Sequence, residues 1–231
     1  MIATDRFVFL HLHKSAGTFV NECLLRFVPG ARRIGYHLPR RLIPTELAAL
    51  PVLGVVRNPW SYYVSWFSFQ SARRVPNALY RLLSEDGRLG FAGTVRNLVG
   101  LGTDQRCLDR VIDALPPRYG RRGINLPGFA LAELRGRAMG FYAYLYEYMF
   151  GSTDRQLTIG RMESLRQDLP HMIESTGQAL SREMREFIDH GEPRNVAHHA
   201  RYTDCYDDAL RDLVAERDAP VIARHGYRFG D

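Results

Sequence analysis

The sequence predicts an α/β fold, with a central, mainly parallel sheet flanked by helices and a helical C-terminal part. Over the first 70 residues, short apolar runs typical of buried strands alternate with helical patterns. Residues 52–56 are apolar apart from one glycine, as expected for a strand buried on both faces of a parallel sheet. A chain of 231 residues can form one full hydrophobic core, so we expect a single domain over residues 1–231.

The composition excludes several classes of protein. Apolar residues make up 45% of the chain and charged residues 24%, and the formal net charge is +6. These near-average values exclude a disordered tail, a collagen-like repeat and a disulfide-dense mini-domain. No apolar run approaches the roughly 20 residues that a membrane span needs, and no signal peptide is evident. Three cysteines without a Cys-x-x-Cys pair fit a reducing compartment, so we expect a cytoplasmic protein without a metal site.

The first part of the chain gives a strand, a tight loop and a helix. Residues 6–12 are mostly apolar and β-prone, and Thr18 opens a helical pattern that ends at Pro29 and Gly30. A short strand at 33–36, a short helix at 44–50, the strand at 52–56 and a helix from Pro59 to about Gln70 follow. The order β-α-β-α-β-α is typical of a parallel sheet.

The rest of the chain is mainly helical. One long helix is expected over residues 131–150 and a short strand over 156–160. Further helices are expected at 77–84, 163–177, 180–190 and 203–217. Residues 86–129 are rich in Gly, Pro and Arg and allow no assignment, so we interpret them as a substrate-facing insertion.

The loop after the first strand has the parts of a phosphate cradle. Residues 14–18 read Lys-Ser-Ala-Gly-Thr and so offer a cation, small residues, a glycine able to take positive φ and a hydroxyl at a helix start. A helix N-terminus presents unpaired N–H groups and a partial positive charge, which favour an anion. The spacing is not that of the Walker A motif, because the lysine precedes the glycine. An ordinary strand–helix turn is the alternative interpretation.

Lysine is almost absent from this chain. Lys14 is the only lysine among 31 basic residues. A bias toward arginine codons explains the shortage elsewhere. Retention of one lysine at this loop indicates a role for a compact point charge, which arginine supplies poorly.

A second basic position follows the strand at residues 52–56. Arg57 comes directly after this strand, and Ser65 lies two turns into the next helix. Ligands of open α/β sheets bind beyond the carboxyl ends of the strands, so Arg57 should emerge near Lys14. Arg57 and Ser65 together could clamp a second phosphate, whereas an ion pair with a nearby acid is the alternative for Arg57.

These motifs resemble those of sulfotransferases that use 3′-phosphoadenosine 5′-phosphosulfate (PAPS). Residues 13–18 look like their 5′-phosphosulfate loop, and residues 56–59 with Ser65 look like their 3′-phosphate segment. Residues 160–165 and 206–229 are also similar to stretches of that family. The resemblance is closest to carbohydrate sulfotransferases and their bacterial relatives. Tyr62 departs from it, because many members have an arginine there.

The resemblance implies a P-loop-like three-layer fold and a nucleotide-binding enzyme that uses PAPS as co-substrate without a metal. It implies transfer of a sulfuryl group to an acceptor hydroxyl, or less commonly an amine, with a sugar or glycan as the expected acceptor. Lys14 would stabilise the leaving phosphate. The expected nucleotide-binding residues are Lys14, Ser15, Ala16, Gly17, Thr18, Arg57 and Ser65. Arg201 is a second candidate for the 3′-phosphate, from a region that can fold over the nucleotide in this family.

The acceptor hydroxyl needs a general base, for which His37 is our candidate. It follows the expected strand at 33–36, and related uronyl sulfotransferases have a catalytic histidine in a similar place. Glu22, one helical turn past Thr18, is the rival. His11 and His13 flank the loop, and His11 is expected to pack at the strand end.

Other functions remain open at this level. An ATP-dependent P-loop phosphotransferase would need a Walker A loop and a Mg²⁺-holding acid, and neither is visible. A nucleic-acid-binding module would need clustered basic residues, but the arginines are scattered, so no nucleic acid is expected as a partner. A catalytically inactive nucleotide-binding protein is the third alternative.

Overall fold

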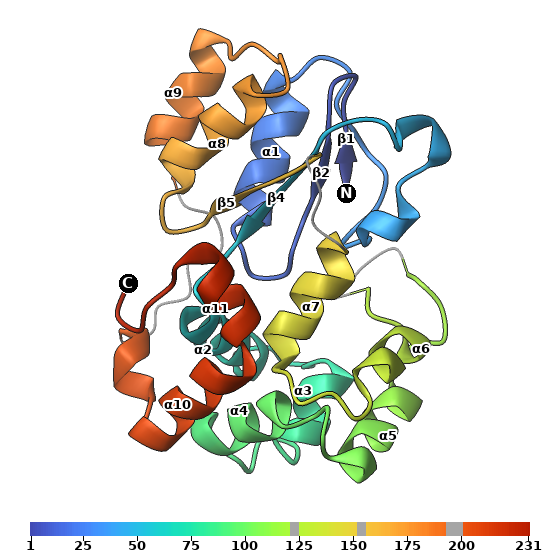
Figure 1. The fold of residues 1–231 in the computed structure, drawn as a ribbon, viewed down its shortest axis with the longest axis vertical. Coiled ribbons are helices and arrows are strands. Elements are labelled where there is room, and N and C mark those ends of the chain that lie inside the picture. Colours follow the sequence, from blue (N-terminus) through green and yellow to red (C-terminus); the bar gives the residue numbers. More distant parts are fainter. Residues whose placement is uncertain (121–124, 152–155, 193–200) are drawn as a thin grey trace. The chain divides into compact units, whose positions relative to one another are not determined.

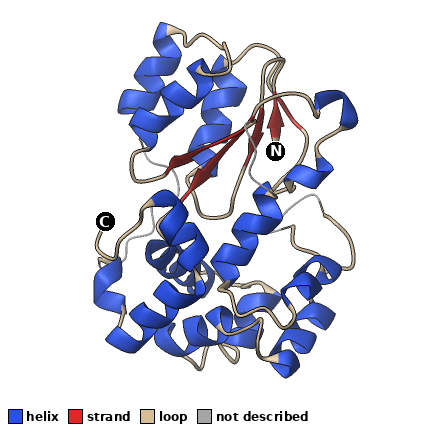
Figure 2. Ribbon diagram, viewed as in Figure 1, coloured by secondary structure: helices blue, strands red, loops and turns tan. Residues whose placement is uncertain are grey.

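The computed structural model describes residues 1–120, 125–151, 156–192 and 201–231. The chain divides into two compact units. The first comprises Met1–Arg57, Arg121–Asn125 and Glu147–Val196, and the second comprises Asn58–Gly120, Leu126–Tyr146 and Ala197–Asp231. Among the described residues, the strands all belong to the first unit and the second unit is helical (Figure 2). A single domain over residues 1–231 stays a prediction.

The first unit is built on a five-stranded mixed sheet with the strand order β3-β1-β2-β4-β5. The strands β2, β4 and β5 run parallel, whereas β1 is antiparallel to both β2 and β3. The α/β class with parallel strands at its centre is therefore confirmed. The strand bounds are β1 Ile2–Ala3, β2 Val8–Leu10, β3 Arg32–Arg33, β4 Val52–Val56 and β5 Leu157–Arg161.

One face of this sheet is covered by α1 (Gly17–Phe27), α8 (Leu165–Glu174) and α9 (Arg182–His190) (Figure 1). Phe9, Leu53 and Val55 point to this face and are almost fully buried against the three helices. Side chains alternate between the two faces of a strand, so the neighbouring residues point to the opposite face. This packing fixes β2 and β4, from which the loops of the candidate site emerge.

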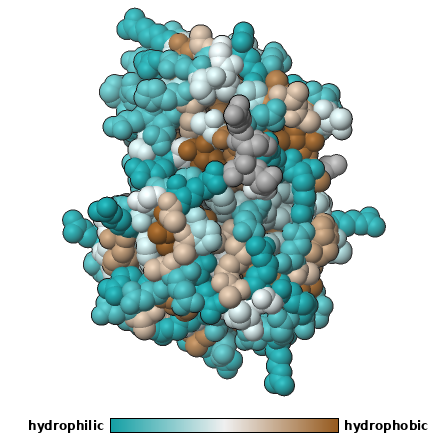
Figure 3. Space-filling view, viewed as in Figure 1, coloured by the Kyte–Doolittle hydropathy of each residue, from teal (hydrophilic) through white to brown (hydrophobic). Residues whose placement is uncertain are grey.

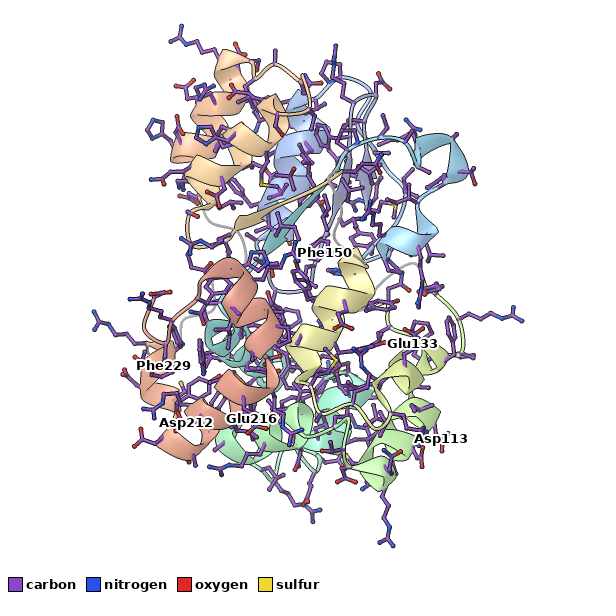
Figure 4. The ribbon with its side chains drawn as sticks, viewed as in Figure 1. Asp113, Glu133, Phe150, Asp212, Glu216 and Phe229 are labelled. Atoms are coloured by element: carbon purple, nitrogen blue, oxygen red, sulfur yellow. The ribbon has the colours of Figure 1, made fainter. Side chains whose placement is uncertain are left out.

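The opposite face receives the end of α7 (Phe141–Phe150). A Cβ at Gly54 would lie 2.3 Å from Cε1 of Phe150, so the aromatic ring requires a glycine there. Figure 4 labels Phe150 at the end of α7 that belongs to the first unit. The glycine inside the apolar run 52–56 is thus explained by close packing.

The second unit contains the remaining α-helices of the described residues, whereas the short 3₁₀ helices Arg40–Leu42 and Thr45–Leu47 belong to the first unit. The helix bounds are α2 Pro59–Ser71, α3 Ala78–Leu83, α4 Phe91–Val99, α5 Gln105–Ala114, α6 Gly128–Leu131, α10 Asp208–Arg217 and α11 Ala219–His225, with most of α7. Four of its helices, α2, α3, α5 and α10, begin after residues whose short polar side chains accept hydrogen bonds from the first turn: Asn58, Asn77, Asp104 and Asp207.

An aromatic cluster holds the C-terminal residues of the second unit against α2. The ring of Phe229, labelled in Figure 4, makes edge contacts with Trp60, Tyr202 and Tyr206 at centroid distances of 5.6 to 5.7 Å. The Tyr206 hydroxyl donates to the Trp60 carbonyl at 2.9 Å. Such aromatic pairs stabilise a fold beyond their buried area, so this end of the unit is well anchored.

Several predicted elements differ from the structure. The expected helix over 131–150 is broken, because Gly136 has a φ of 72° and Gly140 packs directly against Asp218. The segment 86–129, left unassigned, contains α4, α5 and the start of α6. The expected strand at 33–36 is replaced by the shorter strand β3 at Arg32–Arg33, which shares only Arg33 with it. This strand is antiparallel to β1, a strand that the sequence pattern did not predict.

The outer surface is mostly hydrophilic on the face drawn in Figure 3, with hydrophobic residues in smaller groups. No helix within the described residues combines the length and the apolar character that crossing a bilayer requires.

Candidate functional site

The loop between β2 and α1 has an unusual backbone. Lys14 and Ala16 have left-handed φ values of 58° and 54°, although neither is a residue type that favours this region, and Ser15 between them does not share it. Alternating backbone handedness turns successive N–H groups toward one side and forms a concave, anion-binding nest. Ala16 is also the N-cap of α1 and supplies no side-chain hydrogen bond. The first N–H groups of α1 thus lie next to this nest.

Gly17 is required by packing. The left-handed residues of the loop are Lys14 and Ala16, so Gly17 does not use its ability to take positive φ. A Cβ at Gly17 would lie 1.7 Å from Cδ2 of His11, whose ring occupies that space. The expected packing of His11 at the strand end is confirmed, since this residue is only 8% exposed.

Lys14 and Arg57 come together at the carboxyl edge of the sheet. The Nη1 atom of Arg57 donates to the Lys14 carbonyl oxygen at 3.3 Å. Burial, and secondly the charge of Arg57, lower the pKa of Lys14 to about 8. At neutral pH Lys14 is still mainly protonated, and a bound anion would favour its charged form.

The two hydroxyl residues of the loop have different surroundings. The Ser15 hydroxyl donates to the His13 carbonyl at 3.3 Å, and Ser15 is fully buried. Thr18 lies in the first turn of α1 and is exposed. Ser15 therefore stabilises the loop, and Thr18 presents its side chain at the surface.

Three imidazole rings gather beside the loop. The ring centroid of His37 lies 4.2 Å from that of His11 and 4.3 Å from that of His13. The His37 Nδ1 atom is 2.8 Å from the His11 carbonyl oxygen, which can only accept. His37 therefore carries its proton on Nδ1 and keeps the lone pair on Nε2, the arrangement that a general base needs.

Burial keeps these three rings neutral. It lowers the pKa of His37 to about 4, although the hydrogen bond to the His11 carbonyl opposes this shift. Burial, followed by the neighbouring imidazoles, also holds the pKa of His11 and His13 well below the usual range. Nδ1 of His13 and Oδ1 of Asn21 are buried and have no hydrogen-bond partner within the described part of the chain.

Glu22, the rival base, lies further along α1 and is half-buried. Its charge adds to burial in raising the pKa of the neighbouring Cys23 thiol to about 12. The histidine cluster contains His37 and not Glu22, and the choice between the two as general base stays a prediction.

Ser65 and Arg201 belong to the second unit. Ser65 lies on α2 and is 4% exposed, and Arg201 is exposed just before the short 3₁₀ helix Tyr202–Cys205. On the same helix, the Tyr62 hydroxyl is buried and has no hydrogen-bond partner among the described residues. The roles of Ser65 and Arg201 in nucleotide binding stay predictions.

Arg161 was not among the predicted site residues. It ends β5, and the strand register pairs it with Val56, immediately before Arg57. The carboxylate of Asp168 fixes this turn, because Oδ2 accepts from the Arg161 N–H at 2.7 Å and from the Ser164 hydroxyl at 2.9 Å. The sequence shows a basic residue directly after the strand expected at 156–160. Only the strand register shows that this residue, Arg161, lies next to the end of β4, where Arg57 follows.

No protein-family model matches this chain, and a search of curated proteins finds no significant match. The resemblance to PAPS-dependent sulfotransferases stays a prediction from the motifs described above.

Proposed function

We propose that this chain is a sulfotransferase that moves a sulfuryl group from PAPS to an acceptor hydroxyl, with an amine as the less favoured acceptor. The observation that carries the proposal is the left-handed backbone at Lys14 and Ala16. Each non-glycine residue in this region costs about 1–2 kcal/mol, so a fold keeps it where the geometry is needed. A nest beside a helix N-terminus, next to Lys14 and Arg57, suits a phosphate.

Lys14 and the loop would act on the leaving group. PAPS supplies the activated sulfuryl group, attached through a bridging oxygen to its 5′-phosphate. Lys14 provides a compact positive charge where negative charge grows as the bond to that oxygen breaks. The N–H groups of residues 15–18 would hold the 5′-phosphate, and Arg57, with Ser65 and Arg201 as further candidates, would hold the 3′-phosphate.

His37 would take the proton from the acceptor. Its Nδ1–H donates to the His11 carbonyl, so Nε2 carries the lone pair that accepts a proton. With a pKa of about 4, His37 is neutral at pH 7 but is a weak base. Negative charge bound near Lys14 raises the pKa of neighbouring groups, so nucleotide binding would strengthen this base. A sugar or glycan hydroxyl is the proposed acceptor, by the resemblance alone.

Calorimetric titration with 3′-phosphoadenosine 5′-phosphate in EDTA tests the proposal. We expect micromolar affinity, equivalent to about −8 kcal/mol, and a large loss of affinity in Arg57→Ala and Lys14→Ala. ATP with Mg²⁺ is the comparison ligand. Asn97→Asp is a control variant. Like Arg57, Asn97 donates from its side chain to a backbone carbonyl, that of Leu83, but it lies in the helical second unit.

A folded protein that binds ATP with Mg²⁺ but not the bisphosphate would contradict the proposal and favour a phosphotransferase. Tight bisphosphate binding without transfer to any hydroxyl or amine acceptor would favour the inactive nucleotide-binding protein.

The single lysine allows a second, direct measurement. Reductive ¹³C-methylation labels Lys14 and, besides it, only the α-amino group of Met1. Burial, and secondly the charge of Arg33, lower the pKa of that amino group to about 5, so the two signals titrate separately. NMR titration should give a pKa of about 8 for Lys14, and a higher value once the bisphosphate is bound. An unchanged pKa on binding would mean that the anion does not lie near Lys14.

A further inference from the structure

The conformation of His37 is strained and is held from several sides. His37 has a left-handed φ of 46°, and its side chain is fixed by the hydrogen bond from Nδ1 to the His11 carbonyl. A residue in this region persists only where the surroundings determine it. One hydrogen bond to the ring does not fix the backbone, so a second group must hold the turn.

Asn125 supplies that second group. Its Nδ2 atom donates to the carbonyl oxygen of Tyr36 at 2.7 Å, across 89 positions of sequence. This carbonyl belongs to the peptide group that joins Tyr36 to His37. Since a carbonyl oxygen only accepts, the amide of Asn125 must present its nitrogen here. The hydrogen bond fixes the plane of this peptide group and therefore restricts φ of His37.

Asn125 is itself held in place. It is only 4% exposed and has a left-handed φ of 54°, which asparagine tolerates better than most residues. Its carbonyl oxygen accepts from the Tyr148 hydroxyl at 3.0 Å. Tyr148 lies on α7 in the part that belongs to the first unit, and the guanidinium of Arg41 lies 5.1 Å from the centre of its ring. The Tyr148–Asn125–Tyr36 chain therefore connects α7 with the His37 turn.

We propose that Asn125 is a positioning residue that sets the orientation of His37 and thereby helps to form the catalytic site. This inference rests on the proposed function for the role of His37 as base. The positioning itself is a property of the described residues of the first unit and can be measured without substrate.

Three variants test it. Asn125→Asp keeps the size and the tolerance of left-handed backbone but replaces the donor with an acceptor facing the Tyr36 carbonyl. Asn125→Gly keeps the backbone conformation at no steric cost and removes the side chain. Tyr148→Phe is a milder variant that removes only the hydrogen bond to the Asn125 carbonyl, and it serves if the others do not fold. Asn97→Asp is the matched control, since its Nδ2 donates to the Leu83 carbonyl at 2.9 Å in the second unit.

The first readout is the tautomer and titration of His37 from two-bond ¹H–¹⁵N spectra, with its signal assigned by loss in His37→Gln. The wild type and Asn97→Asp should show a single Nδ1–H tautomer with a strongly lowered pKa. Asn125→Asp and Asn125→Gly should show mixed tautomers and a pKa nearer the ordinary histidine value. A His37 signal unchanged in all three test variants would overturn the proposal.

The second readout separates this inference from the proposed function. Bisphosphate affinity should stay within about twofold of wild type in the Asn125 variants, while the turnover number falls about 10- to 100-fold because a base moved by 1 Å loses this much. Failure of the wild type to bind the bisphosphate would count against the sulfotransferase proposal, and the NMR result would still decide whether Asn125 orients His37. A raised KM with unchanged turnover would contradict the positioning role.

Discussion

Each unit of this protein buries a polar cluster, and the two clusters are built in opposite ways. In the second unit, Asp218 is fully buried and both carboxylate oxygens accept hydrogen bonds, from the Tyr63 hydroxyl at 2.8 Å and from the Ala143 N–H at 2.7 Å. The Tyr63 oxygen in turn accepts from the Tyr142 N–H. This cluster caps α7 and joins it to α2 and the α10–α11 turn.

The histidine cluster of the first unit lacks this saturation. Nδ1 of His13 has no hydrogen-bond partner in the described chain, and left-handed residues lie at Lys14, Ala16 and His37. Saturated hydrogen bonding stabilises a buried cluster, whereas left-handed backbone at non-glycine residues costs free energy and is concentrated at ligand-binding sites. The contrast supports a structural role for Asp218 and a functional one for the Lys14 loop.

The largest expected effect is on catalysis at Lys14. Lys14→Ala should lower the sulfuryl transfer rate by about 10²–10³-fold, because the charge that stabilises the leaving group is lost. Lys14→Arg should recover only part of this loss, since a planar guanidinium is not a compact point charge. Single-turnover measurements with radiolabelled PAPS give these rates. A wild-type transfer rate in Lys14→Ala would contradict the functional role of the Lys14 loop.

The Asp218 cluster should respond in stability instead. Asp218→Asn should lower the free energy of unfolding by about 2–4 kcal/mol, because one of the two donors would face the amide nitrogen. Tyr63→Phe, which leaves one carboxylate oxygen unpaired, should cost about 1–3 kcal/mol. Urea denaturation followed by circular dichroism measures both. Bisphosphate affinity of the folded variants should be unchanged, and a loss of affinity would mean that the cluster is not only structural.

The two clusters should also respond oppositely to pH. Burial lowers the pKa of His37 to about 4, so the unfolded chain binds more protons between about pH 4 and 6.5, and the first unit loses stability as the pH falls through this range. Burial raises the pKa of Asp218 to about 7. The folded state therefore binds more protons than the unfolded chain between about pH 4 and 7, and the second unit loses stability as the pH rises through this range. Hydrogen exchange, corrected for intrinsic rates, resolves the two units between pH 5 and 7.5. Parallel changes in both units would contradict these assignments.

Modest effects on stability are expected at two adjacent residues of the loop. Ala16→Gly should stabilise the protein by up to about 1 kcal/mol, because glycine takes left-handed backbone without strain. Gly17→Ala should destabilise it by about 1–3 kcal/mol, because the new Cβ overlaps the His11 ring. Thermal unfolding curves measure both changes. Equal effects of the two substitutions would mean that the handedness of the loop has been assigned to the wrong residues.

Short-range sequence patterns predicted several elements of the fold correctly. Residues 52–56 form a strand as expected, and a helix begins at Pro59, because apolar runs, proline and capping residues act locally. The prediction of one continuous helix over residues 131–150 was wrong, because the apolar side chains there are compatible with one helix or with several. The contact between Gly140 and Asp218, 78 residues apart, decides where α7 begins.

The candidate site shows the same division. The sequence alone determined that a lone lysine lies in a small-residue loop between a strand and a helix, and that an arginine ends a second strand. Local composition is enough for that, since each feature lies within a few consecutive residues. Only the tertiary structure decided that Ala16 and not Gly17 is left-handed, that three histidines share one cluster, and that Asn125 holds the His37 turn. The physical reason is that ring packing, backbone handedness and hydrogen bonds between distant segments depend on which residues the fold brings together.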